Sequence, residues 1–177
     1  MAPQFRILLL LPLFASLTIQ AQDVRVVTRV VSDTVPAWKT WKADGFSMNH
    51  PGKWTVDVTV MGDTVVMFRK GIKGADPTTP EVAVIVQGMD GKFAPLPKRL
   101  KKSDLKDVEF IQNESSEMAS SSRAEYRCKD KGANIHVLEQ LVEKGDRSYL
   151  LTYMAPAEAY DEYLFLAEAM LNSFSAP

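Results

Sequence analysis

The chain has 177 residues, with 21 lysines and arginines against 22 aspartates and glutamates, and one cysteine. This near-neutral balance argues against a general nucleic-acid-binding surface, because such surfaces are strongly basic. A single cysteine excludes an intramolecular disulfide, so a packed core has to hold the one domain that this length predicts.

The first 21 residues have the pattern of a secretory signal peptide. Arg6 supplies the positive charge, and residues 7–17 form an apolar stretch that is shorter than the roughly 20 residues of a membrane-spanning helix. Ile19 and Ala21 fit the positions before a cleavage site, which leaves Gln22 as the new N-terminus; cleavage after Gln22 is the alternative. We therefore expect an exported, soluble protein, periplasmic or secreted, without a transmembrane span.

Residues 22–44 are predicted to form an N-terminal arm. Its valine-rich stretch, residues 24–31, has high β propensity and favours an added edge strand. Two tryptophans, Trp38 and Trp41, follow in the same arm. The remaining residues, 45–177, are predicted to form the folded domain.

Hairpin patterns begin after residue 45. The triplet His50-Pro51-Gly52 predicts a turn, and residues 55–61 alternate apolar and polar side chains as a half-buried strand does. Gly62-Asp63 is typical of a two-residue hairpin, with residues 64–69 as the returning strand. The unbroken apolar run from Val82 to Val86 predicts a strand covered on both faces.

The second half of the chain predicts more strands between two helices. We expect a short helix over residues 99–107, and strands over residues 108–112, 123–129 and 149–154. Residues 135–142 fit a strand with a bulge, although a helix also fits, and the serine-rich residues 114–122 fit a loop or a weak edge. Apolar residues at helical spacing after Pro156 predict a C-terminal helix that starts at that proline; its face comprises Tyr160, Tyr163, Leu164, Ala167, Met170, Leu171 and Phe174.

These elements predict the α+β class. Because hairpins dominate, we expect an antiparallel β-sheet of about six strands flanked by helices.

Two segments resemble the PsbP-like or DcrB-like domain family. GFSMNHPGKW, residues 45–54, is similar to the opening of these domains, and YLLTYMAP with the closing LNSF, residues 149–156 and 171–174, is similar to their end. The resemblance implies an α/β/α sandwich, with Phe46 and Trp54 in the core and Pro51 and Gly52 in a turn. Relatives of this kind serve as photosystem accessory subunits, an import factor, envelope proteins and chaperones for hydrophobic segments, and they share no catalytic motif.

No group of residues has the pattern of a catalytic or metal site. His50 and His136 are the only histidines, fewer than a zinc site usually takes, and we expect them in a turn and at the surface. Cys128 shares a strand face with Ala124 and Tyr126, which predicts a buried thiol rather than a nucleophile. We accordingly expect no cofactor, no metal and no enzyme activity.

Two features are candidates for contact with a partner. Trp38 and Trp41 would be good interface anchors if exposed, although packing of the arm onto the sheet explains them equally. A basic cluster, diluted by Asp104 and Asp107, suits an anionic partner surface or lipid headgroups, or simply a solvated helix face. It comprises Lys98, Arg99, Lys101, Lys102 and Lys106. The sequence predicts an exported, non-catalytic accessory protein of the cell envelope; a chaperone-like clamp for an apolar segment is the alternative.

Overall fold

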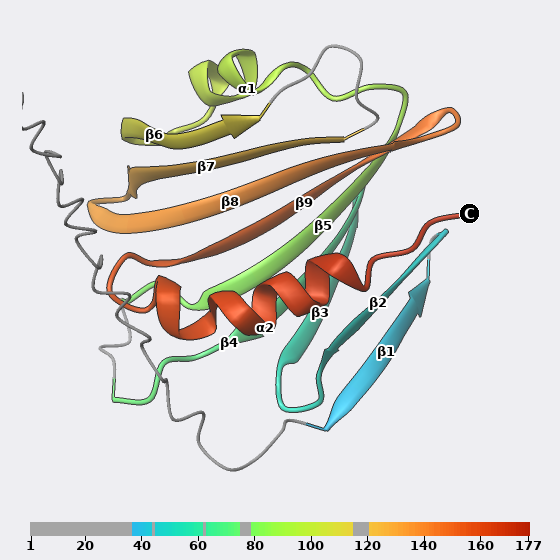
Figure 1. Ribbon diagram of the computed structural model, residues 1–177, viewed down its shortest axis with the longest axis horizontal. Coiled ribbons are helices and arrows are strands. Elements are labelled where there is room, and N and C mark those ends of the chain that lie inside the picture. The colour runs from blue at the N-terminus through green and yellow to red at the C-terminus, as the bar shows by residue number, and fades with distance from the viewer. Residues whose placement is uncertain (1–36, 44, 62, 75–78, 115–120) are drawn as a thin grey trace, which may run out of the picture. The chain divides into compact units, whose positions relative to one another are not determined.

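Nine strands and two helices make up the described part of the chain, residues 37–43, 45–61, 63–74, 79–114 and 121–177 of a computed structural model (Figure 1). All of these residues belong to one unit, Val35–Pro177. The predicted signal peptide, residues 1–21, and the valine-rich residues 24–31 lie outside the described residues.

A two-stranded antiparallel sheet begins the fold. It pairs β1 (Trp38–Ala43) with β2 (Phe46–Pro51). The whole of β1 lies within the residues that the sequence predicts as an arm, 22–44. Gly52, which follows β2, lies against the residue before β1: its amide donates to the Ala37 carbonyl at 2.6 Å. A Cβ at position 52 would lie 2.8 Å from that oxygen, so the close approach requires a glycine.

The main sheet has seven strands, all antiparallel, in the spatial order β3-β4-β5-β9-β8-β7-β6. The strands are β3 (Thr55–Met61), β4 (Asp63–Lys70), β5 (Val82–Asp90), β6 (Lys106–Glu114), β7 (Ser121–Asp130), β8 (Ala133–Lys144) and β9 (Arg147–Pro156). Strands that follow one another in sequence mostly pair as hairpins. The exception is the connection from β5 to β6, which crosses from the middle of the sheet to its far edge, so that β5 pairs with β9.

Local chemistry explains the tightest of these hairpins. Only Lys131 and Gly132 separate β7 from β8, with φ angles of 48° and 90°. Two positive φ angles in a two-residue loop define the turn that matches the twist of antiparallel strands, and glycine adopts that region without steric cost.

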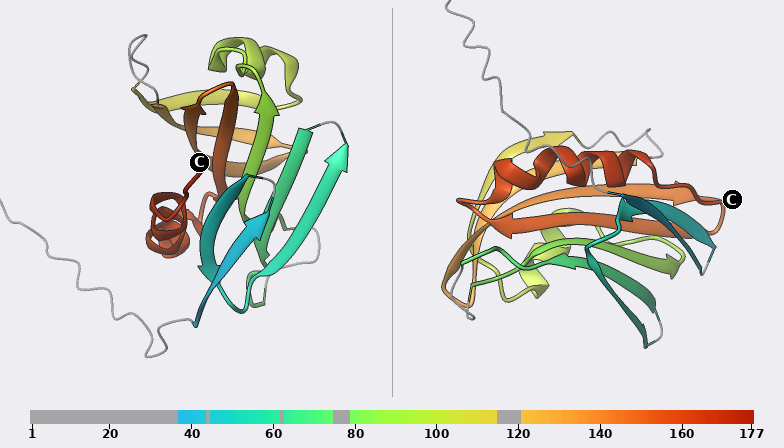
Figure 2. Two further views of the ribbon diagram at one scale, coloured as in Figure 1. Left: turned by 90° about the vertical axis from the view of Figure 1, so that its right-hand side faces the viewer. Right: turned by 90° about the horizontal axis from the view of Figure 1, so that it is seen from below.

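The larger core lies between one face of the sheet and the C-terminal helix α2 (Tyr160–Asn172), with the β1–β2 hairpin beside it (Figure 2). Asp161 and Glu162 lie in the first turn of α2, where carboxylates favour the helix dipole. Its apolar side meets alternate residues of the central strands; the fully buried members include Met48, Phe68, Val84, Leu138, Leu151, Tyr153, Ala167 and Met170.

A smaller core lies on the other face of the sheet, under helix α1 (Leu96–Lys102). Val137 belongs to this core and its neighbour Leu138 to the larger one. Because successive strand residues point to opposite faces, α1 and α2 pack on opposite sides of the sheet. Leu96 and Leu100 of α1 pack against a cluster of Tyr126, Cys128, Ile135 and Val137.

The structure confirms the α+β class and the antiparallel sheet, and corrects several details. The main sheet has seven strands rather than about six. Residues 135–142 are strand, and their pairing runs without a bulge on both sides. Pro156 ends β9, so α2 starts four residues later, at Tyr160. The short helix spans Leu96–Lys102 rather than residues 99–107, and residues 106 and 107 belong to β6. Pro97 lies in its first turn, a position that a proline tolerates well.

Candidate functional site

The face of the sheet that carries α1 is covered over β7 and β8, and open over β4, β5 and β9. Strand pairing aligns the side chains of this face in rows across the sheet. One row runs from Val65 through Gln87 to Leu150, and the next from Met67 through Ile85 to Thr152. We call these six residues the open face: Val65, Met67, Ile85, Gln87, Leu150 and Thr152.

The open face is mainly apolar. Leu150 is buried, and the other five side chains are half-buried. No helix of the described residues lies over these strands on this side, since α1 packs against the β7–β8 cluster and α2 against the other face. This pattern departs from the prediction that the Val82–Val86 run is covered on both faces, because Ile85 keeps part of its surface accessible.

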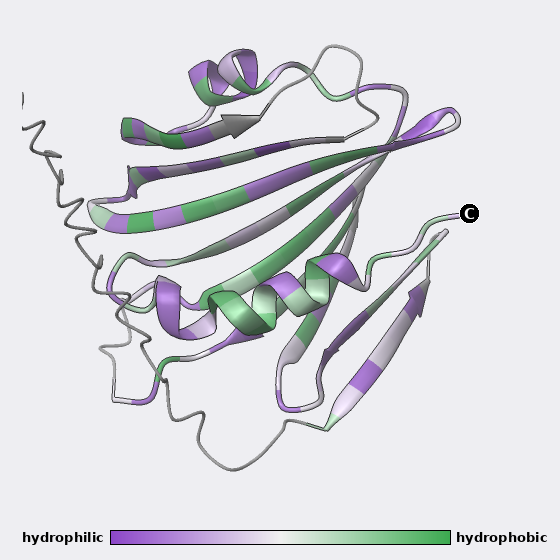
Figure 3. Ribbon diagram, viewed as in Figure 1, coloured by the Kyte–Doolittle hydropathy of each residue, from purple (hydrophilic) through white to green (hydrophobic). Residues whose placement is uncertain are grey.

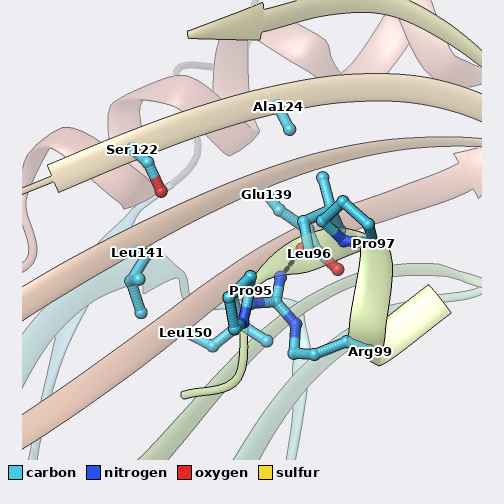
Figure 4. A pocket seen from close by; sticks show the side chains of 9 residues that line it. All are labelled: Pro95, Leu96, Pro97, Arg99, Ser122, Ala124, Glu139, Leu141 and Leu150. Carbon is cyan, nitrogen blue, oxygen red and sulfur yellow. Dashed lines mark hydrogen bonds and ion pairs between the residues drawn. The ribbon is translucent and has the colours of Figure 1, made fainter. Parts of the chain in front are cut away.

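A pocket of about 170 Å³ lies where the open face meets α1 (Figure 4). Its floor comes from β7, β8 and β9 and its wall from the segment that leads into α1. The lining residues are Pro95, Leu96, Pro97, Arg99, Ser122, Ala124, Glu139, Leu141 and Leu150. Leu141 pairs with Leu150 in the sheet, so the pocket continues the Val65–Gln87–Leu150 row.

An ion pair lies within this pocket. The Arg99 guanidinium donates to Glu139 and also to the Ala94 carbonyl, at 3.1 Å. The Tyr126 hydroxyl donates to the other Glu139 oxygen at 3.0 Å. Burial, with help from the Glu139 charge, raises the pKa of Tyr126 far above its usual range, so the hydroxyl stays protonated and remains a donor.

The polar side chains of the pocket are already hydrogen-bonded to one another. Both Glu139 oxygens accept hydrogen bonds from fixed donors, and the side chains of Arg99 and Glu139 are only 20% and 12% exposed. A catalytic acid or base needs to reach a substrate proton, whereas this carboxylate is already engaged. The pocket is therefore suited to holding an apolar group beside a satisfied polar pair.

The structure separates the two predicted tryptophan contacts. They lie three apart on β1, and odd spacing on a strand puts side chains on opposite faces. Trp41 packs against the larger core, whereas Trp38 is 38% exposed. The hairpin thus offers one exposed tryptophan, and its role in partner contact stays a prediction.

The predicted basic cluster is divided as well. Arg99 turns inward to Glu139, while Lys98, Lys101 and Lys102 of α1 are exposed. Partner contact through these lysines also stays a prediction.

Both histidines are buried, so the expectation of turn and surface histidines is wrong. His50 and His136 are each 6% exposed. His50 packs on Phe68 with ring centroids 5.0 Å apart, and His136 stacks on Tyr160. Among the described residues, no group of three or more His, Cys, Asp or Glu side chains could hold a metal ion.

Cys128 is buried, as its strand pattern predicts. Burial, and then the negative charges of Asp130 and Glu139, raise the pKa of its thiol to about 11. Such a thiol is protonated at neutral pH and has little nucleophilic character.

Sequence reasoning did not single out the open face or Glu139. The strand predicted at residues 64–69 does imply that Val65 and Met67 share a face, because side chains two apart on a strand point the same way. Which strands lie beside that face depends on the placement of β5 next to β9, residues far apart in the chain, and short-range patterns do not contain this pairing.

Comparison with known proteins yields fold similarities alone. No protein-family model matches the sequence, and no curated protein does either. Cyanobacterial PsbP from Synechocystis is 13% identical at a TM-score of 0.49, with 82% of this chain and 96% of that chain covered. A Pseudomonas aeruginosa protein of unknown function, PA94, is 10% identical at a TM-score of 0.47, covering 79% of this chain and 96% of the other.

A third similar structure is LpqN of Mycobacterium tuberculosis, described as involved in cell envelope biogenesis. It is 14% identical at a TM-score of 0.41, with 75% of this chain and 91% of LpqN covered. One of the three is a PsbP protein. Nothing about function follows from likenesses of this kind, and membership of the family stays a prediction.

Proposed function

We propose that this chain is an exported, non-catalytic accessory protein of the cell envelope that binds another envelope protein through its open face. The apolar leader predicted at residues 1–21 supports export. The helices of the described residues, α1 and α2, have 7 and 13 residues, and none of them is long and apolar enough to cross a membrane. The partner is therefore expected to meet a folded domain.

The observation that carries the proposal is the row of side chains across β4, β5 and β9. Met67 and Ile85 stand side by side on adjacent strands, with Val65 and Leu150 in the neighbouring row. Val65, Met67 and Ile85 keep accessible area at the middle of the sheet, whereas Leu150 is buried. Covering such hydrophobic surface contributes about 25 cal/mol per Å². A partner that packs on this row would remove the remaining apolar surface from water, as partners do at apolar interaction sites.

The polar members of the face fit recognition better than catalysis. Gln87 and Thr152 lie among the apolar side chains, and interfaces combine an apolar centre with a few hydrogen-bonding groups. The charged groups beside the face are paired: Glu139, next to Thr152 in the sheet, binds Arg99, and Asp57, next to Met67, binds Arg69. We therefore assign no catalytic residue.

A chaperone-like clamp for an apolar segment of another protein is the second candidate. The pocket beside α1 favours it, because Leu96, Leu141 and Leu150 line a space of about 170 Å³ that continues the open face. A side chain of leucine or phenylalanine size from a bound segment would fit such a space, while the rest of the segment lay along the open face.

Affinity capture from the native envelope tests the proposal. The mature wild-type protein is compared with Ile85→Glu and Met67→Glu, each of which places a charge in the open face, and with Phe165→Glu as a matched control. Phe165 is 72% exposed on α2, on the other side of the sheet. We expect one envelope protein to be retained by wild type and by the control and lost from both open-face variants.

Equal capture by all four proteins would contradict the proposal. A thermal unfolding curve for each variant guards against loss by misfolding, and the two open-face variants serve as checks on one another. If the captured protein also binds as a synthetic apolar segment alone, the clamp is favoured over docking of a folded partner.

A further inference from the structure

The edge of the molecule formed by α1 and β6 combines exposed lysines with exposed apolar side chains. Lys98, Lys101 and Lys102 of α1 are exposed, and none of them forms an ion pair with the described residues. Phe110 and Ile111 of β6 are 46% and 47% exposed. We call these five residues the α1–β6 edge.

The fold places the two parts of this edge together. Only residues 103–105 connect α1 to β6, and the two elements lie side by side in Figure 1. Leu96 and Leu100 pack α1 onto the cluster that contains Tyr126, and the Phe110 ring lies 5.9 Å from the Tyr126 ring. Phe110 therefore emerges from the sheet directly beside the helix that carries the lysines.

A β-bulge turns Ile111 out of the sheet. Phe110 pairs with Tyr126 and Gln112 with Glu125, which leaves Ile111 without a partner in the ladder. A second register shift lies between Lys106 and Glu109, with Asp107 at a positive φ of 50°. Irregularities of this kind blunt an edge against pairing with another strand, so strand addition by a second chain is disfavoured here.

The exposed positive charges of α1 come from lysines. The one arginine of α1, Arg99, is taken by Glu139, so the exposed cations are all lysines. Arginine is the usual residue for paired contacts with carboxylates, whereas lysine acts as a compact, hydrated point charge. Lysines beside a protruding Phe and Ile match a surface whose negative charge is diffuse and whose interior is apolar. Figure 3 shows α1 as largely hydrophilic, with hydrophobic positions nearby on β6.

We propose that the α1–β6 edge is a peripheral membrane-binding surface, with Lys98, Lys101 and Lys102 on anionic headgroups and Phe110 and Ile111 inserted at the headgroup level. Basic residues with apolar anchors bind anionic bilayers in this manner. Of the neighbouring carboxylates, Asp107 is held by Lys129 at 2.6 Å, while Asp104 and Glu109 remain exposed and weaken the attraction. The binding is accordingly reversible and sensitive to salt.

Co-sedimentation with vesicles tests this surface. The mature full chain is mixed with vesicles of phosphatidylglycerol and phosphatidylcholine in equal parts, and with phosphatidylcholine alone. We expect binding to the anionic vesicles only, and its loss when salt rises from about 0.05 M to about 0.5 M, because screening shortens the reach of the charges. Lys98→Gln/Lys101→Gln/Lys102→Gln is expected to weaken binding by about fivefold per lysine, roughly a hundredfold together.

Three further variants make the outcome decisive. Lys39→Gln/Lys42→Gln/Lys53→Gln removes three exposed lysines from the other end of the unit, at β1 and the turn after β2, and should leave binding unchanged. Phe110→Ser should weaken binding several-fold, and Asp104→Asn/Glu109→Gln should strengthen it. A misfolded Asp104→Asn/Glu109→Gln variant is not expected to bind anionic vesicles more strongly, so a gain in binding cannot be explained by loss of the fold.

The proposal is overturned by any of three results. These are absence of binding to anionic vesicles, equal loss in both lysine triples, or no gain on removal of Asp104 and Glu109. Capture of an acidic protein by the same lysines, without vesicle binding, would assign the edge to a protein partner instead. The vesicle assay uses no open-face residue, so its failure leaves the proposed function untouched.

Discussion

The imidazole of His136 on β8 lies flat against the ring of Tyr160, the first residue of α2, with centroids 3.5 Å apart and planes 16° apart. A Glu125 oxygen lies 2.8 Å from Nε2 of the same imidazole. The Tyr153 hydroxyl donates to the Tyr160 carbonyl at 2.6 Å. Contacts from three strands thus fix the beginning of α2, which makes this helix a structural cover of the sheet and leaves the opposite face as the candidate for binding.

Truncation of the buried side of α2 should destabilise the fold without any partner. Leu171 is 4% exposed, and Leu→Ala in a core costs about 2 to 5 kcal/mol, a large part of the roughly 5 to 15 kcal/mol of a domain. Leu171→Ala should lower the thermal midpoint clearly, and Phe165→Ala on the exposed side should not. An unchanged midpoint in Leu171→Ala would mean that α2 does not depend on the sheet.

Stability should fall on mild acidification because both histidines are buried. Burial lowers the pKa of His136, with Arg127 acting in the same direction and Glu125 and Asp161 opposing it. The pKa of His50 is also lowered mainly by burial, with a smaller contribution from Lys39 and opposition from the Pro51 carbonyl. Below the ordinary value of 6.5, the unfolded chain takes up protons that the folded chain resists, so protonation favours unfolding.

Chemical denaturation between about pH 7.5 and pH 5 measures this effect. The free energy of unfolding should be level above pH 6.5 and decline as the pH falls through the lowered pKa values. In the double variant His50→Asn/His136→Asn, the free energy of unfolding should fall less between neutral and acidic pH than it does in wild type. Parallel curves for wild type and the double variant would show that other groups carry the acid sensitivity.

Cys128 should resist thiol reagents in the folded protein. The residue is 3% exposed, and the pKa of its thiol is raised to about 11, so access and ionisation both limit attack. Labelling with a maleimide near pH 7.5 should be slow in buffer and fast in denaturant. Fast labelling of the native protein would show that the thiol is accessible and contradict its burial.

The Arg99–Glu139 pair should contribute to stability and to the shape of the pocket. Glu139→Ala leaves the Arg99 guanidinium and the Tyr126 hydroxyl without their shared acceptor. Loss of a buried charged acceptor costs about 1.5 to 3 kcal/mol. Lys101→Ala, an exposed change on the same helix, should cost almost nothing. Urea unfolding of both variants measures this contribution. Equal midpoints for Glu139→Ala and Lys101→Ala would show that the ion pair adds little to the free energy of unfolding.

Local patterns predicted most of the strands and both helices. The alternation of residues 55–61 and the hairpin signal after them correspond to β3 and β4, because side chains on a half-buried strand must alternate. Burial of Cys128 followed from the same reasoning. The short helix was predicted at residues 99–107 and lies at Leu96–Lys102, and the C-terminal helix starts at Tyr160 rather than at Pro156. A proline fits the first turn of a helix and also the end of a strand, so Pro156 alone did not fix the start of α2.

Long-range pairing explains what the sequence did not predict. The two histidines were predicted in a turn and at the surface because their ring partners lie far away in the sequence. His50 packs on Phe68 and His136 on Tyr160. Likewise, the valine run of β5 indicated cover on both faces, yet α1 stops over β7 and β8. Which face stays open depends on where a seven-residue helix docks, and that position is set by contacts between segments far apart in the chain.

Site-specific photo-crosslinking in the intact host tests the open face most directly. A photoreactive amino acid replaces Ile85 in one strain and Phe165 in another, which samples opposite sides of the same sheet at similar expression. If a partner binds through the open face, we expect a discrete crosslinked adduct with an envelope protein from position 85 and none from position 165. An adduct from position 165 alone, or identical adducts from both positions, would contradict binding through the open face.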